Sequence, residues 1–464
     1  MRESYKHLLN YTANLITLLV DAFLFGLIWY KYYALWIMDD VRVAAIYAGR
    51  GNYAVIGLYV LFVFFFTQVM GGYKIGYMRV SDIILSNVLG LIMSNFIGFF
   101  ELCLVCRDYV YPVPLILIMI IEIIFIIIWN LIIREGYKAL YPPRQMILVY
   151  GEYAPDELIN KINTRKDKYN ICATISCFGD QAELLNTIDN YKAVVLCDLP
   201  ADVRNIILKH CYGKSIRTYV TPKISDVLFR GADDIHLFDT PLLLSRNQGL
   251  TIDQRFFKRM MDIIISLIGI VVASPFMLII AIAIKLYDHG PIFYLQERLT
   301  RDGKEFKIIK FRSMKIADEN DTERITMKDD DRITPIGRVI RNIHFDELPQ
   351  LFNILKGDMA VVGPRPEWKL TTEKYTEEIP EFKFRLKVKA GLTGYAQVWG
   401  KYNTTPYDKL KLDLTYIENY SIWLDLKILL LTVKILFQKE NTEGVDSDQL
   451  TALKGKADME DLND

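Results

Sequence analysis

Long apolar runs fill the first 134 residues of the chain. Four of them are close to the roughly 20 residues that cross a bilayer as a helix, and they lie near residues 12–33, 53–70, 82–105 and 113–133. The first run lacks a small-residue cleavage site and further runs follow it, so it is not expected to be a cleavable signal. The pattern predicts a bundle of four transmembrane helices within residues 1–140.

The pattern changes between residues 141 and 250, where short apolar runs alternate with polar stretches. RQMILVY, ICATISCF, AVVLCD and IRTYV are typical of strands, and APDELINKINTRKDK is typical of a helix. These elements predict a Rossmann-like α/β domain. A dinucleotide site would carry G-x-G-x-x-G after the first strand, but only Gly151 stands there. We therefore expect a structural or oligomerising domain.

A fifth apolar run covers residues 258–288 and contains Ser274-Pro275 at its centre. A proline inside a helix removes one backbone hydrogen bond and kinks it, and the serine hydroxyl could satisfy the freed carbonyl. Basic residues flank both ends, namely Lys258, Arg259, Lys285, Arg298 and Arg301. We expect a re-entrant hairpin that enters and leaves one face of the membrane; an ordinary kinked span is the alternative.

The rest of the pattern, residues 251–440 with that hairpin, predicts a further α/β domain. KIIKFRSM alternates like a half-buried strand, which would place Lys307, Lys310 and, one step on, Arg312 near a common site. Residues 416–437 carry Trp423 and a broad apolar face, as an interfacial helix or a plain core helix would. The acidic tail, residues 441–464, is expected to be disordered.

Composition supports a membrane protein. The chain is 52% hydrophobic, its mean hydropathy is +0.18, and its formal net charge of zero gives no basic field for nucleic acid. Cys103-x-x-Cys106 resembles half a zinc site, but no matching pair follows, so we expect the six cysteines to be free thiols.

Basic residues predict the orientation of the four helices. Two groups fall on opposite sides of the membrane, and the second is diluted by Asp39, Asp40 and Asp108. The positive-inside rule therefore places the N-terminus and everything after residue 134 in the cytoplasm. The first group is Arg2, Lys6, Lys74, Arg79, Arg134, Lys138 and Arg144, and the second is Lys31, Arg42, Arg50 and Arg107.

The stretch FDELPQ combines two adjacent acids, Asp346 and Glu347, with Pro349. Proline suits the first position of a helix and biases the preceding residue, Leu348, away from helix. A short helix from about Pro349 to Lys356 would end at Gly357. The acids would then lie before its N-terminus, where the helix dipole lowers carboxylate pKa values. Ionised carboxylates can attack phosphorus or hold a divalent cation.

Cationic side chains surround this pair in the sequence. Guanidinium forks match phosphate oxygens and lysine supplies a point charge, so such a group fits a diphosphate clamp better than scattered surface charge. The group is Lys310, Arg312, Arg332, Arg338, Arg341 and Arg365.

Several linked motifs carry a resemblance. KRMMDI, SPF, GPIFYLQER, KFRSM, DRITPIGRVIR, FDELPQLFNILKGDMAVVGPRPE and AGLTGYAQVWG together resemble the bacterial sugar transferase family, the monotopic polyprenyl-phosphate hexose-1-phosphate transferases. The likeness covers roughly residues 255–440, and the four spans with a degenerate nucleotide-binding-like domain are similar to the family's long form.

The resemblance implies a reaction. A UDP-hexose, with glucose or galactose favoured, would donate hexose 1-phosphate to undecaprenyl phosphate and release UMP, as the first step of capsule, exopolysaccharide or O-antigen synthesis. Asp346 would be the nucleophile that forms a phosphosugar–aspartyl intermediate, and Glu347, with Asp346, would hold Mg²⁺. The enzyme would sit in the bacterial inner membrane with its catalytic domain facing the cytoplasm, with a homodimer possible.

Further residues follow from matching positions. Lys310, Arg312, Arg341 and Arg365 would bind phosphates, and Gln350 would support the site; Asp262, Ser274 and Pro275 would be structural parts of the hairpin. The chain departs from the family pattern at Thr300, Phe345 and Lys401, the last of which leaves donor contacts in doubt. We expect no catalytic role for His344, although it lies beside the acid pair, and we expect Asp331 to belong to a solvated turn.

Two alternatives stay open at this point. One is a glycosyltransferase that releases UDP, and the other is a non-catalytic membrane scaffold of a polysaccharide assembly complex. The sequence does not define which sugar is transferred.

Overall fold

The computed structural model describes residues 2–34, 50–151, 155–245, 249–315, 332–400 and 404–437. The expected tail at 441–464, Asp331 and Lys401 lie outside these ranges. The chain divides into two compact units, Met1–Pro222 and Lys223–Asp464, and each is described by itself.

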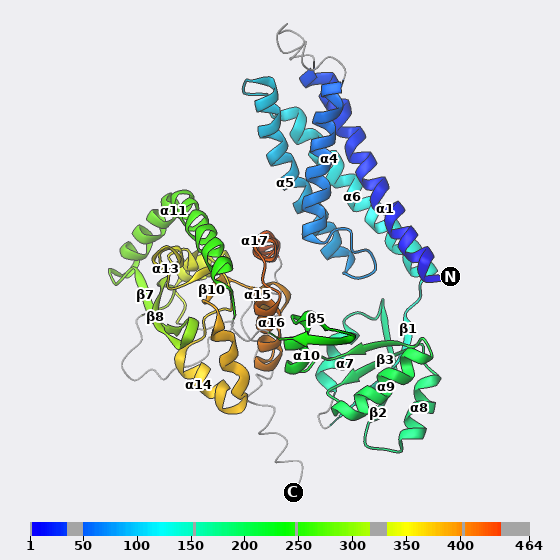
Figure 1. Ribbon diagram of the computed structural model, residues 1–464. Coiled ribbons are helices and arrows are strands. Elements are labelled where there is room, and N and C mark those ends of the chain that lie inside the picture. Colours follow the sequence, from blue (N-terminus) through cyan, green and yellow to red (C-terminus); the bar gives the residue numbers. More distant parts are fainter. Residues whose placement is uncertain are drawn as a thin grey trace. The chain divides into compact units, whose positions relative to one another are not determined.

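The first unit begins with a bundle of long apolar helices (Figure 1). They are α1 (Arg2–Ile28), extended by one π-helical turn (Trp29–Tyr33), α4 (Arg50–Met70), α5 (Val80–Cys106) and α6 (Val113–Leu140). All four are long and apolar enough to cross a membrane, as the sequence predicts. Their facing sides bury Phe25, Trp29, Tyr59 and Leu91, whereas residues such as Leu19 and Ile128 stay exposed, as expected of lipid-facing side chains.

A parallel sheet completes the first unit, with the order β2-β1-β3-β4. Its strands are β1 (Arg144–Tyr150), β2 (Tyr169–Ser176), β3 (Ala193–Cys197) and β4 (Arg217–Val220), connected by α7 (Asp156–Asn163), α8 (Gln181–Asp189) and α9 (Ala201–Gly213). The four predicted strands are therefore confirmed. The apolar residues 146–149 of β1 and 193–196 of β3 are buried, which explains the continuous apolar runs of these middle strands. A side chain at Gly151 would overlap the Asp198 carbonyl, so this glycine serves a close backbone contact.

The second unit begins at Lys223. Its first helix, α10 (Ile224–Arg230), contributes Val227 to the core of this unit, and β5 (Asp233–Leu237) and β6 (Thr240–Leu244) form an exposed antiparallel hairpin. The division between the compact units thus falls at Pro222–Lys223, whereas the apolar pattern had suggested a border near residue 250. The reason is that α10 packs against a helix that follows it by almost 200 residues in the chain, α16 (Pro406–Glu418).

The catalytic region predicted from sequence combines helices with two small sheets. An antiparallel pair joins β7 (Phe293–Leu299) to β8 (Glu305–Phe311), and a parallel pair joins β9 (Ala360–Val362) to β10 (Gly391–Thr393). The larger of two buried clusters, which includes Phe306, Ile354, Val362 and Leu414, lies among them. The helices are α12 (Pro335–Asn342), α13 (Gln350–Lys356), α14 (Lys369–Glu378), α15 (Tyr395–Trp399), α16 and α17 (Ile422–Leu436), and the 3₁₀ segments are Arg301–Gly303, Phe345–Glu347 and Pro380–Lys387.

The fifth apolar run forms α11 (Ile252–Asp288), with Pro275 inside it. A straight helix of its 37 residues would be about 55 Å long, but α11 is visibly bent (Figure 1). The Ser274 hydroxyl donates to the Val271 carbonyl, four residues before the proline, at 2.8 Å. This confirms the predicted role of the serine, because that carbonyl is the one the proline leaves without its helical donor.

Both halves of α11 pack within the second unit. Before the bend, Asp262 accepts a hydrogen bond from the Val361 N–H at 2.9 Å, and Arg259 donates to the Ile354 carbonyl at 2.7 Å. After the bend, Ile280 joins a cluster with Phe311. A helix whose two ends hold the same globular unit is consistent with the expected hairpin.

Two local predictions need correction. Leu348 was expected to avoid helix but has φ −53° and ψ −37°, because the 3₁₀ turn at Phe345–Glu347 leads directly into α13. Residues 416–437 were expected to form one helix, but α16 ends at Glu418 and α17 begins after Ser421, whose hydroxyl caps the Leu424 N–H at 3.1 Å. The predicted end of α13 is confirmed, since Gly357 has φ +103°.

Candidate active site

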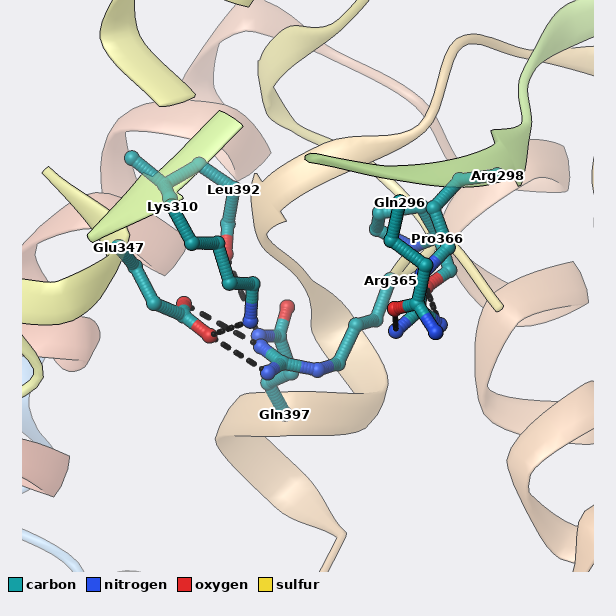
Figure 2. A network of polar contacts seen from close by, with 8 residues as sticks. All are labelled: Gln296, Arg298, Lys310, Glu347, Arg365, Pro366, Leu392 and Gln397. Carbon is teal, nitrogen blue, oxygen red and sulfur yellow. Dashed lines mark hydrogen bonds and ion pairs between the residues drawn. The ribbon is translucent and has the colours of Figure 1, made fainter. Parts of the chain in front are cut away.

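Glu347 is the centre of a charge cluster in the second unit. Its Oε1 accepts from the Lys310 Nζ at 2.8 Å and from the Arg365 Nη2 at 2.7 Å. Lys310 comes from β8 and Arg365 from the loop after β9, so three separate segments converge on one carboxylate (Figure 2). The Glu347 side chain is only 13% exposed. Two cations on one buried carboxylate leave the cluster with a net positive charge, as a phosphate site requires.

Asp346 lies beside this cluster but differs from Glu347. Among the described residues, no hydrogen bond or ion pair within the usual distances holds its carboxylate, which is part-buried in the 3₁₀ turn. The turn is fixed by backbone bonds from the Glu347 N–H to the His344 carbonyl and from the Leu348 N–H to the Phe345 carbonyl, both 3.3 Å. One acid of the pair is therefore clamped, and the other is positioned but open to a ligand.

The two carboxyls have opposite pKa shifts. Burial and the neighbouring Glu347 charge raise the pKa of Asp346, against the opposing charges of Lys310 and Arg341. Burial alone would raise the pKa of Glu347 too, but Arg365 and Lys310 hold it well below its usual range. The expectation that both pKa values are lowered is thus wrong for Asp346, because local burial and a like charge outweigh the helix terminus.

The other predicted residues occupy different places. Arg341, in the last turn of α12, is near enough for its charge to act on Asp346, and the structure shows no hydrogen bond or ion pair from its guanidinium to another described residue. Gln350 is buried at the first position of α13. The Arg341 guanidinium is therefore not engaged by another described residue, and the supporting role expected of Gln350 stays a prediction.

Arg312 departs from the expected arrangement. Its guanidinium is buried and pairs with Asp288 at the end of α11. The backbone N–H of Arg312 donates to the Ile292 carbonyl at 2.9 Å. A side chain at Gly290 would overlap the guanidinium, so the surrounding chain is shaped around it. Alternation along β8 places Arg312 and Lys310 on one face, but the strand ends between them. In this structure Arg312 ties α11 to β8, and its expected phosphate contact stays a prediction.

Sequence reasoning missed a second buried charge network, behind Arg365. Arg385 is 3% exposed; its Nη2 donates to the Arg365 carbonyl at 2.8 Å and pairs with Asp413 at 2.8 Å. Glu367 pairs with Arg385 at 3.6 Å and also with Lys409. Burial alone would raise the pKa of Glu367, but the Lys409 and Arg385 charges lower it to about 2. This network fixes the backbone that presents Arg365.

A signal for part of that network stands in GPRPE, which already contains Glu367 beside the predicted Arg365. A weaker sequence signal was Arg298 in the motif GPIFYLQER. Its guanidinium is largely buried, and it donates to the Pro366 carbonyl at 3.2 Å and to Gln296 at 2.6 Å (Figure 2). Arg385 and Asp413 stand in stretches without a motif, so their pairing was visible only in the structure.

The base of α11 is anchored by a buried ion pair. Lys258 reaches Asp425 of α17 at 2.7 Å, with side chains 6% and 0% exposed. The Tyr416 hydroxyl donates to Asp425 at 2.8 Å and lies 3.2 Å from the Val362 carbonyl. Asp262, one turn further along α11, is 2% exposed and holds β9. The structural role predicted for Asp262 is consistent with these contacts.

A divalent cation is compatible with the acid pair. Across the described residues no three His, Cys, Asp or Glu side chains gather into a ready-made cage. Mg²⁺ commonly takes one or two carboxylates and completes its shell with substrate phosphates and water. Asp346 has free carboxylate oxygens, whereas Glu347 already accepts from two cations. The residues present therefore fit a metal shared with a phosphate better than one held by protein alone.

The family model for bacterial sugar transferases matches residues 253–439. A UDP-glucose:undecaprenyl-phosphate glucose-1-phosphate transferase of Klebsiella pneumoniae is 42% identical over 44% of this chain and 43% of its own length. An undecaprenyl-phosphate galactose phosphotransferase of Salmonella typhimurium is 33% identical over 66% of both chains.

A shorter relative extends the comparison. The UDP-glucose:undecaprenyl-phosphate glucose-1-phosphate transferase of Caulobacter vibrioides is 38% identical over 40% of this chain and 71% of its own length. For the Klebsiella relative, the match spans less than half of the protein. The region matched by the family model, residues 253–439, contains Asp346 and Glu347, the two cations that clamp Glu347, and the bend of α11. On these matches, the chain belongs to the bacterial sugar transferase family.

Proposed function

We propose that this protein transfers hexose 1-phosphate from a UDP-hexose, with glucose or galactose favoured, to undecaprenyl phosphate and releases UMP. The observation that carries the proposal is the contrast within the acid pair: Glu347 is clamped by Lys310 and Arg365, while the adjacent Asp346 carboxylate has no partner among the described residues. The Klebsiella and Salmonella relatives, named as a glucose-1-phosphate transferase and a galactose phosphotransferase, support this substrate class.

In the first step, an Asp346 carboxylate oxygen attacks the phosphorus that bears the sugar. The new bond joins Asp346 to that phosphorus, and the bond to the bridging oxygen breaks, so that UMP leaves with the bridging oxygen. Lys310, Arg341 and Arg365 would offset the charge of the diphosphate during this displacement. Because the displacement needs an ionised carboxylate, a neutral Asp346 would be inactive.

In the second step, a phosphate oxygen of undecaprenyl phosphate attacks the same phosphorus. The aspartyl–phosphorus bond breaks, Asp346 returns to its free carboxylate, and the lipid carries the sugar diphosphate. Each displacement exchanges one oxygen for another at phosphorus, so neither requires a histidine base. This sequence of steps would begin the synthesis of a capsule, an exopolysaccharide or an O-antigen.

Mg²⁺ is part of the proposal. When bound, the metal would neutralise charge on the donor diphosphate. Asp346 is the protein ligand with free oxygens, and Glu347 would join it only if Lys310 or Arg365 turned towards the substrate phosphates.

The proposed location is the bacterial inner membrane, with the catalytic unit on the cytoplasmic face. The positive-inside distribution supports this orientation, and the bend of α11 at Pro275 supports a hairpin that enters and leaves that face. UDP-sugars are cytoplasmic and the lipid phosphate lies at the membrane surface. A site anchored by α11 would therefore meet both substrates.

A homodimer is also proposed. The β5–β6 hairpin leaves its strands exposed, and Phe238 at its turn is 96% exposed. Exposed strand edges with apolar side chains favour pairing with another chain. Light scattering of the purified full chain should give the mass of two copies, and Phe238→Asp should reduce it to one. An unchanged mass in the variant would exclude the hairpin as the contact.

The catalytic proposal is tested by product analysis with the full-length protein in detergent. A panel of UDP-sugars is supplied with undecaprenyl phosphate and Mg²⁺, and the released nucleotide is identified. We expect UMP, and a phosphosugar adduct on Asp346 detectable by mass spectrometry when the lipid is omitted. UDP as the sole product would indicate a glycosyltransferase, and binding without turnover of any UDP-sugar would favour a scaffold.

Matched variants separate chemistry from folding. Asp346→Asn should abolish transfer and adduct formation while the protein stays folded. Asp302→Asn makes the same change at an exposed turn with φ 59°, a conformation that asparagine also tolerates, and should retain activity. Full activity of Asp346→Asn would exclude the covalent mechanism.

A further inference from the structure

The transmembrane bundle has a polar centre that the proposed reaction does not use. Each of its four long helices contributes one side chain: Asp21 from α1, Tyr59 from α4, Asn95 from α5 and Glu122 from α6. Asp21, Tyr59 and Glu122 are 0% exposed and Asn95 is 4% exposed. The four helices lie side by side in Figure 1. Burial of two acids among apolar helices is expensive and is typical of a functional site.

The four side chains form one cluster. The Tyr59 hydroxyl lies 3.2 and 3.3 Å from the two carboxylate oxygens of Glu122. Asn95 lies against both Tyr59 and Glu122, and its Nδ2 donates to the Leu91 carbonyl at 3.0 Å. Asp21 is near enough for its charge to act on both Tyr59 and Glu122. Side-chain contacts therefore join α4, α5 and α6, and Asp21 brings the charge of α1 close to them.

The unsatisfied atoms of this cluster are all acceptors. Both carboxylate oxygens of Asp21 and the Oδ1 of Asn95 are buried without a hydrogen-bond donor. No lysine or arginine among the described residues forms an ion pair with Asp21 or Glu122. A buried acceptor without a donor is costly. Here the three oxygens belong to Asp21 and Asn95, and the group contains a second acid, Glu122, and no cation. What is missing is a positive charge.

We infer that the centre of the bundle is a cation-binding site that takes up a proton or Na⁺ between Asp21, Asn95 and Glu122. Carboxylate and amide oxygens are hard ligands that suit either guest. Two acids with no third carboxylate suit a single positive charge better than a divalent ion. The site lies in the first unit and does not depend on the proposed transfer reaction.

The test begins with the wild-type full chain in detergent and the apolar reagent dicyclohexylcarbodiimide, which modifies protonated carboxyls in apolar surroundings. Labelled positions are mapped by mass spectrometry, with choline chloride replacing NaCl at constant ionic strength. We expect labelling of Asp21 or Glu122 at pH 6. A proton site loses this labelling as the pH is raised to 9; a Na⁺ site loses it when NaCl is added at pH 6. No labelling of either residue at pH 6 in choline chloride overturns the inference.

The second measurement is the thermal melting of the bundle, monitored by the alkylation of Cys103 and Cys106 in α5. For a Na⁺ site, NaCl at ten times its half-saturating concentration should raise the melting temperature by about 3–6 °C. For a proton site, the melting temperature should fall between pH 6 and pH 9. The titratable groups facing Asp21 are Tyr59, Glu122 and Tyr73; α5 contributes only the neutral Asn95 to the cluster.

Variants assign the response to the cluster. Asp21→Asn or Glu122→Gln should remove at least half of the Na⁺ or pH response, and either variant suffices if the other does not fold. Glu135→Gln makes the same change on α6 at a side chain that is 68% exposed, and it should behave as wild type. An identical Na⁺ and pH response in wild type and in a folded cluster variant overturns the inference.

Discussion

Replacing Lys258 by methionine should strongly destabilise the second unit while leaving the shape of the side chain nearly unchanged. Lys258 is 6% exposed and meets the fully buried Asp425 at 2.7 Å. Without Lys258, the Asp425 side chain keeps the hydrogen bond from the Tyr416 hydroxyl as its remaining partner among the described residues. The buried carboxylate must then stay charged without a cation or take up a proton, and both cost free energy.

The magnitude follows from that burial. Breaking a buried ion pair on one side typically costs about 3–5 kcal/mol. For a unit of this size, such a loss lowers the melting temperature by about 6–20 °C. Lys258→Met combined with Asp425→Asn should recover most of the loss, because an asparagine oxygen can still accept from Tyr416 and no charge remains buried.

The assay is thermal unfolding of the full chain in detergent. Unfolding is monitored by the alkylation of a cysteine placed at Ile354, a core position of this unit. Each variant is compared with its parent that carries this cysteine. Lys356→Met is the control. Its side chain is 75% exposed and pairs with Asp358 at 2.9 Å, so the change should stay within about 0.5 kcal/mol. The reasoning is refuted if Lys258→Met has the same melting temperature as this control, or if the double variant has the same melting temperature as Lys258→Met.

Three further predictions concern the site. The pKa of Glu367 is about 2, below its ordinary 4.5, so the ion pairs of Glu367 stabilise the fold at pH values above 4.5. This stabilisation, up to about 3 kcal/mol, is lost as the pH falls towards 2. The stability of Glu367→Gln should therefore lack this part of the pH dependence in an acid unfolding experiment. Because the pKa of Asp346 is raised, the kcat/KM profile should lose activity on the acid side above the ordinary aspartate range. Arg341→Met should move that limb to higher pH, whereas Arg230→Met, at the exposed end of α10, should not. A Cβ at Gly391 would overlap a backbone nitrogen in the segment after β9, so Gly391→Ala should not give folded protein, and a wild-type melting curve would contradict this close packing.

Local pattern was sufficient where one physical effect dominates. The length of each apolar run predicted α1, α4, α5 and α6, because a bilayer requires a helix of about 20 residues. The apolar runs of β1 and β3 predicted buried parallel strands. Pro275 predicted the bend of α11, and Ser274 predicted the hydrogen bond to the carbonyl that the proline frees, because both effects act within one helical turn.

The acid pair shows where local reasoning ends. FDELPQ identified Asp346 and Glu347 as candidates, and Gly357 the end of the following helix. Apart from the family resemblance, the local pattern could not divide their roles, because Lys310 and Arg365 bind Glu347 and come from segments 37 and 18 residues away. The same holds for the raised pKa of Asp346, which depends on burial by neighbours distant in the chain.

What the sequence by itself determined is therefore the set of elements and the identity of the motif residues, since hydrophobic period, proline and glycine act over a few residues. Only the tertiary structure decided which charges meet. It turned Arg312 to Asp288, joined Arg385 to Asp413, and gathered Asp21, Asn95 and Glu122 from three helices. Ion pairs and buried polar clusters are short-range in space but not in sequence, so their partners are set by the packing of the whole unit.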